Sequence, residues 1–137
     1  MLKTIARWLV FLIATLQFFS ALINTADALT LMDYSLAAGI FGLLGAAASL
    51  AGFASVMYGI LKKKAWTLKA AVASAALNSA YVIVIASIPV PEQLLSGMGV
   101  PDVQAAAEIM WAFAWASIFL NAVMAALAYL CSSELKD

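Results

Sequence analysis

The chain has 137 residues, 66% of them hydrophobic and 10% charged, and its seven basic and seven acidic residues leave no net charge. A soluble domain is typically about half apolar and about a quarter charged, so this chain must place apolar surface against lipid or other protein. With no histidine and a single cysteine, Cys131, it offers no disulfide within the chain and no usual set of zinc, haem or thiol-pair ligands. We therefore expect no cofactor and no metal.

The first apolar segment covers about residues 4–25 and begins beside Lys3 and Arg7. A basic start, an apolar run and the small residues of Ala26-Asp27-Ala28 resemble a signal peptide. The apolar run is longer than the core of a usual signal peptide, so we expect a helix that is retained in the mature protein.

The second segment, about residues 33–61, is expected to begin at Asp33, whose carboxylate suits the amino end of a helix. Small residues recur through it, and they are Gly39, Gly42, Gly45, Ser49, Gly52 and Gly59. Glycine weakens an isolated helix, so this pattern indicates close packing against other helices. The partners are either other helices of the same bundle or further copies of the chain, and the pattern does not distinguish them.

The third segment, about residues 66–88, ends before Pro89 and Pro91, and the longest loop follows it. The fourth covers about residues 102–130, with Asp102 expected at its first turn. Each segment is long enough to cross a bilayer. The sequence therefore predicts one all-α domain over residues 1–137, a membrane-protein-like bundle of four long hydrophobic helices.

The charges separate towards the two ends of this bundle. Five of the acidic residues fall at one end, whereas the other end carries all the basic residues, namely Lys3, Arg7, Lys62, Lys63, Lys64, Lys69 and Lys136. Of the acidic residues, Glu134 and Asp137 join this basic end. The positive-inside rule then places both termini and the Lys62–Lys64 turn in the cytoplasm. These cations suit anionic lipid headgroups, and equally the phosphates of nucleic acid bound without regard to sequence.

A few polar side chains lie inside the predicted spans, on one stripe of each helix: Gln17, Asn24, Asn78 and Asn121. Hydrogen bonds between helices explain them without a ligand, and a polar substrate path is the alternative. No carboxylate sits clearly at mid-depth, as coupled transporters usually require. A transporter is therefore disfavoured, and with neither histidine nor paired carboxylates we expect no enzyme.

The small, alanine- and glycine-rich, very hydrophobic chain with its Lys62-Lys63-Lys64 turn resembles the major capsid proteins of the large tailed spindle-shaped viruses of archaea. This resemblance implies a coat protein that inserts in the host membrane and then assembles in many copies around double-stranded DNA in the virion. The alternative is a cellular four-span integral membrane protein, either an accessory subunit of a membrane complex or a holin-like protein.

Overall fold

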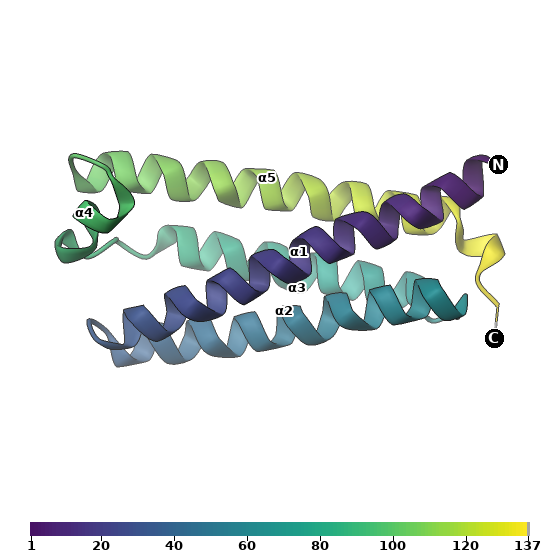
Figure 1. The fold of residues 1–137 in the computed structure, drawn as a ribbon, viewed down its shortest axis with the longest axis horizontal. Coiled ribbons are helices and arrows are strands. Elements are labelled where there is room, and N and C mark those ends of the chain that lie inside the picture. Colours follow the sequence, from purple (N-terminus) through teal and green to yellow (C-terminus); the bar gives the residue numbers. More distant parts are fainter. Residues whose placement is uncertain (137) are drawn as a thin grey trace.

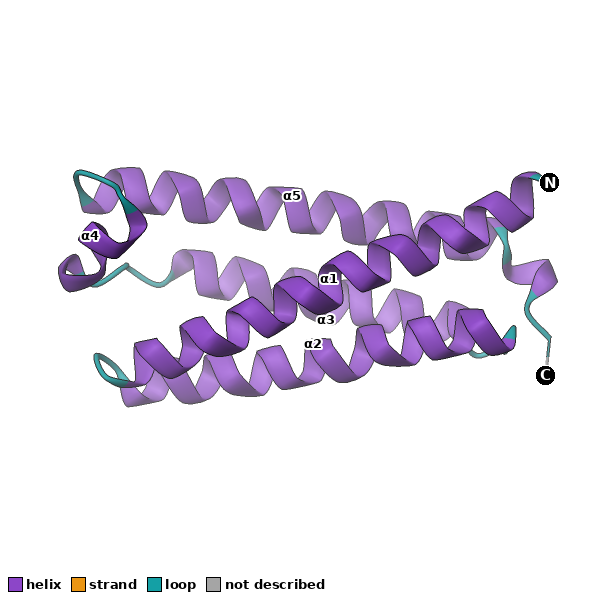
Figure 2. Ribbon diagram, viewed as in Figure 1, coloured by secondary structure: helices purple, strands orange, loops and turns teal. Residues whose placement is uncertain are grey.

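A computed structural model describes residues 1–136, and the helical fold class expected from the sequence is confirmed. The described residues form helices and loops without a strand (Figure 2). The long helices are α1 (Leu2–Met32), α2 (Leu36–Lys62), α3 (Thr67–Ser87) and α5 (Val103–Leu130), and the short ones are η1 (Glu92–Leu94), α4 (Leu95–Met98) and η2 (Ser132–Glu134). Each of the four long helices is long and apolar enough to cross a membrane.

The long helices run alternately up and down the bundle, so both termini and the α2–α3 turn lie at the same end (Figure 1). Helix α1 crosses the bundle diagonally. It lies near α5 at the end with the termini and near α2 at the opposite end. As a result, α1 and α5 separate towards the end that carries α4.

The apolar core is concentrated in the half of the bundle nearest the termini. Val10, Phe53, Val56 and Met124, contributed by α1, α2 and α5, have no exposed surface there. Leu135 of the carboxyl-terminal tail belongs to the same buried cluster. The tail is therefore packed onto the bundle and has a defined position.

The helix boundaries correct one expectation from the sequence. Helix α1 continues to Met32, so the Ala26–Ala28 stretch lies inside it, and Asp33 closes α1 instead of starting α2. Ser35 caps α2 by accepting a hydrogen bond from the backbone N–H of Ala38 at 3.4 Å. The most apolar part of the first helix ends near residue 25. No proline or glycine occurs in residues 25–32, so the helix continues beyond that point.

The expected cap at the other acidic position is confirmed. Asp102 accepts a hydrogen bond from the backbone N–H of Ala105 at 2.8 Å, which satisfies a free amide in the first turn of α5. At the opposite end of the bundle, α2 stops because Lys63 adopts the left-handed conformation with φ of 52°. The loop expected after Pro91 contains η1 and the single turn of α4.

The small residues of α2 face neighbouring helices of the same chain. A β-carbon added at Gly39 or Gly42 would meet Met32 or Ala28 of α1, and one added at Gly45 would meet the ring of Tyr81 in α3. A β-carbon added at Gly52 would meet Ser74 of α3, and one added at Gly59 would meet Thr67 of α3. Helix α2 can therefore approach α1 and α3 closely along its whole length because these side chains are absent.

Candidate functional site

Polar side chains from all four long helices meet in the middle of the bundle. Gln17 of α1 donates from Nε2 to Oδ1 of Asn121 at 2.9 Å, and Asn121 donates from Nδ2 to Oδ1 of Asn78 at 2.9 Å. Asn78 in turn donates to the hydroxyl of Ser49 at 3.0 Å. Ser117 joins this network through hydrogen bonds with Gln17 and Asn78 at 3.1 Å each.

The members of this network satisfy one another. The three amide side chains are at most 3% exposed, and none of their nitrogen or oxygen atoms is a buried atom without a partner. Three of the four predicted interhelical polar residues, Gln17, Asn78 and Asn121, are thus brought together. The arrangement is a hydrogen-bonded crosslink between helices, which is the simpler of the two explanations that the sequence left open.

Asn24, the fourth of these residues, lies apart from the network, in a groove between α1, α3 and α5. The groove has a volume of about 540 Å³, and Phe19, Ile109 and Phe113 are among its apolar lining residues. It adjoins a second hollow of about 360 Å³ beneath the loop that contains α4, and Asp27 lines both. The separation of α1 from α5 opens this groove on the side of the bundle.

The basic end holds a more polar hollow, with a volume of about 630 Å³. Its lining comes from three separate parts of the chain, namely Thr4, Arg7, Lys62, Lys63, Lys64, Ser133, Glu134 and Lys136. Five of these side chains are cations and one is a carboxylate. This concentration of like charge around one concavity makes it the candidate functional site.

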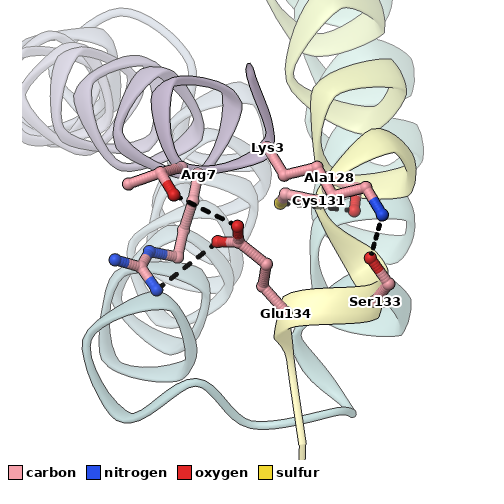
Figure 3. A network of polar contacts seen from close by, with 7 residues as sticks. Lys3, Arg7, Ala128, Cys131, Ser133 and Glu134 are labelled. Carbon is pink, nitrogen blue, oxygen red and sulfur yellow. Dashed lines mark hydrogen bonds and ion pairs between the residues drawn. The ribbon is translucent and has the colours of Figure 1, made fainter. Parts of the chain in front are cut away.

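Glu134 organises the amino-terminal side of the hollow, and Figure 3 shows its contacts. Its Oε1 accepts a hydrogen bond from the Thr4 hydroxyl at 3.1 Å, and its Oε2 forms an ion pair with Arg7 at 3.6 Å. That Oε2 atom is buried and has no hydrogen bond among the described residues. Lys3 donates to the Ser133 hydroxyl at 2.8 Å (Figure 3), so the first turn of α1 is fastened to η2.

The carboxyl-terminal tail also reaches the lysine turn, because the backbone N–H of Lys136 donates to the carbonyl of Lys63. Of the six basic residues predicted from the sequence, Arg7, Lys62, Lys63 and Lys64 line the hollow. Lys3 lies beside it through Ser133, and Lys69 does not line it.

Four lining residues of the hollow were not among the predicted site residues, and they are Thr4, Ser133, Glu134 and Lys136. Glu134 and Lys136 were assigned to the basic end from the sequence, but without a role in a site. The available signal was the placement of both termini and the Lys62–Lys64 turn at one end of an even-numbered bundle. That placement brings the polar tail close to the lysines, although it does not reveal which atoms meet.

Cys131 ends α5 next to this site, and its side chain is fully buried. Burial raises the pKa of its thiol, and the nearby Glu134 carboxylate adds to the increase, whereas Arg7 and a backbone hydrogen bond oppose it. The thiol therefore stays protonated and enclosed, a state that disfavours acylation or oxidation.

Among residues 1–136, no three histidine, cysteine or acidic side chains are grouped so that they could hold a metal ion. Comparisons with known protein families, curated proteins and solved structures find no match for this chain.

Proposed function

We propose that this chain is a structural, four-span integral membrane protein without enzymatic activity. The observation that carries the proposal is the large apolar surface on the outside of the bundle. Polar amides lie inside the bundle, whereas large apolar side chains such as Leu12, Phe19, Phe113 and Phe119 are each more than half exposed on its outside. Lipid tails are a suitable environment for such a surface, and water is not.

The separation of charge along the bundle also supports a position across a membrane. Lysines surround the end that holds the termini, whereas Asp33, Glu92 and Asp102 belong to the turns at the opposite end. Trp8 and Trp66, both of which are exposed, lie near the lysine-rich boundary, at the depth where aromatic side chains favour the interface.

The test is membrane extraction after expression in a bacterium. The protein should remain in membranes washed with alkaline carbonate and should need detergent for release, because four apolar helices contact the hydrocarbon region. Recovery in the soluble fraction without detergent, as a monodisperse protein, would overturn the proposal.

A coat protein that surrounds packaged DNA is the second candidate, favoured by one observation. The exposed apolar side chains extend along the outside of both α1 and α5, so copies of the chain have a large surface for lateral association once lipid is lost. The lysine-rich end would then face double-stranded DNA and neutralise its phosphates non-specifically.

These candidates differ in what is recovered from the native source without detergent. Regular tubes or spindle-shaped particles with nuclease-protected DNA would establish a coat protein of many copies in a virion. Recovery only in membrane vesicles would favour a cellular membrane protein, and co-purification with an unlike subunit in fixed ratio would identify it as an accessory subunit.

A further inference from the structure

The hollow at the basic end gathers its cations around one concavity, as a ligand site does, whereas lysines at a membrane interface are usually scattered. We propose that it binds the phosphate of an anionic phospholipid headgroup, and this assignment rests on the proposed position in a membrane. The chemistry to be recognised is a phosphate anion, and its source is a membrane lipid.

The charge of the lining suits an anion. Arg7, Lys62, Lys63, Lys64 and Lys136 surround the hollow, and Glu134 is the one carboxylate among its described lining residues. Glu134 is already engaged by Thr4 and Arg7, so its charge serves mainly to hold the Arg7 guanidinium in place. The lysines on the opposite wall have no carboxylate partner within 4.0 Å among the described residues. A bound phosphate would give these lysines a partner of opposite charge.

The walls of the hollow are fixed to one another, which favours a defined site. The hydrogen bond from Lys136 to the Lys63 carbonyl joins the tail to the lysine turn, and the bond from Lys3 to Ser133 joins α1 to η2. Leu135, between these contacts, is buried in the core. The volume of about 630 Å³ falls within the range of small-ligand pockets, about 300–1,000 Å³.

The surroundings favour a lipid over other carriers of phosphate. Exposed apolar side chains, Leu2, Ile5 and Leu61, occur on the same helix ends that form the hollow. Arg7 lies 5.6 Å from the centre of the Trp8 ring, and Trp66 stacks on Tyr58 with ring centres 6.4 Å apart, as aromatic groups do at the lipid–water boundary. A headgroup in the hollow would thus have apolar surface beside it for its acyl chains.

Duplex DNA fits this geometry less well. Its phosphates follow one another along a strand, so it is best neutralised by an extended basic surface. The cations here converge on a single concavity instead, and Lys69, on the first turn of α3, lies outside its lining. Lys69 therefore provides a control for simple loss of positive charge.

The experiment is native mass spectrometry of the full chain purified in detergent, with added phosphatidylglycerol and, separately, phosphatidylcholine. The wild type should retain phosphatidylglycerol with at least about tenfold preference. The K62Q/K63Q/K64Q variant should lose about a hundredfold in affinity for phosphatidylglycerol, at about 1 kcal/mol for each lysine. Lys69→Gln, at a position outside the lining, should change that affinity less than about twofold. Unchanged helical circular dichroism and melting temperature would show that the variants are folded.

Competition experiments with inorganic phosphate and with duplex DNA decide the source of the phosphate. Inorganic phosphate at millimolar concentration should fail to displace the lipid, and displacement would overturn the lipid assignment in favour of free phosphate. A short DNA duplex that binds more tightly than the lipid, and does so through the same three lysines, would overturn it in favour of nucleic acid. An equal loss of binding free energy per charge removed in Lys69→Gln and in the triple variant would also overturn it, because only diffuse charge would then be acting.

Failure of this inference can be told apart from failure of the proposed function. If both the wild type and the triple variant resist carbonate extraction but neither prefers phosphatidylglycerol, the chain is a membrane protein without this site. If the wild type is soluble without detergent, the proposed function itself is wrong.

Discussion

The Nε2 atom of Gln17 lies 2.9 Å from Oδ1 of Asn121, and this buried hydrogen bond joins the first and last long helices of the chain. The same asparagine donates to Asn78 and to the hydroxyl of Ser79 at 3.1 Å. One side chain thus links α1 to α3 through α5. Hydrogen bonds in an apolar bundle are modest one by one, about 0.6 kcal/mol on average in a membrane, so the network matters mainly because its members depend on each other.

Asn121→Ala should lower the free energy of unfolding by about 1–3 kcal/mol, because it removes one hydrogen bond from each of the buried amides of Gln17 and Asn78 and leaves a cavity. These two amides then keep only their hydrogen bonds to Ser117 and Ser49. The measurement is reversible unfolding in mixed micelles with increasing sodium dodecyl sulfate. Ser55→Ala is the control, because the exposed Ser55 hydroxyl bonds only to the Ala51 carbonyl of its own helix. Equal destabilisation by the two variants would contradict the crosslink.

Gly45→Ala should destabilise the bundle by about 1–3 kcal/mol, since the added methyl group would overlap the aromatic ring of Tyr81. Gly97→Ala has open space around it and lies in the short helix α4, so it should be neutral or slightly stabilising. The two variants can be compared by thermal unfolding in the same detergent. Tolerance of alanine at position 45 would show that α2 and α3 pack less closely than described.

Asp102→Ala should cost about 0.5–2 kcal/mol, because it removes the side-chain acceptor for the Ala105 amide at the start of α5. Asp33→Ala should cost less than about 0.5 kcal/mol, because Ser35 is the residue that caps α2. The pair separates two acidic residues that look equivalent in the sequence. A larger loss for Asp33→Ala in chemical or thermal unfolding would restore the assignment of the cap to Asp33.

The Cys131 thiol should react only slowly with a maleimide at pH 7 in the folded protein, since it is fully buried and burial raises its pKa. The folded state binds this proton more tightly than the unfolded chain does. The stability that the protonated thiol contributes is therefore complete below its ordinary pKa of 9.0. This contribution is lost as the pH rises through the higher pKa of the thiol in the folded protein. Rapid labelling should appear after denaturation in sodium dodecyl sulfate, and rapid labelling of the folded protein at pH 7 would disprove the burial.

The two ends of the bundle should face opposite sides of the membrane, with the lysine-rich end in the cytoplasm. In a Cys131→Ser background, Ser96→Cys should react with an impermeant maleimide in intact spheroplasts. Lys136→Cys should react only after the membrane is opened. Both native side chains are exposed, so access to the reagent depends on the side of the membrane. Labelling of both positions in intact spheroplasts would contradict the topology.

Much of the fold follows from local features of the sequence. Apolar runs long enough to span a bilayer, the prolines at 89 and 91, and Asp102 before the last run predict where helices begin and end. The first helix was predicted too short because Thr25 and Asp27 interrupt the apolar run, whereas no proline or glycine in residues 25–32 ends the helix. It remains helical by packing Ala28 against Gly42, a contact that apolar length alone does not reveal.

The candidate site was only partly predictable for a similar reason. The lysines could be assigned to one end because burying their charge in hydrocarbon is costly, whatever their neighbours. The tail could be assigned to the same end, but its contacts could not be predicted, because the position of Glu134 depends on Thr4 and Arg7, residues about 130 positions away in the chain.

The sequence by itself determined four apolar helices and the end to which each charge belongs, since both depend on the free energy of placing individual side chains in water or hydrocarbon. Only the tertiary structure decided that Gln17, Asn78 and Asn121 meet, that the glycines of α2 face α1 and α3, and that tail and lysine turn enclose one hollow. These features depend on how the helices cross one another, and the diagonal course of α1 across the bundle is one example (Figure 1). That course follows from how side chains on different helices fit together, a property of the assembled chain that no single segment contains.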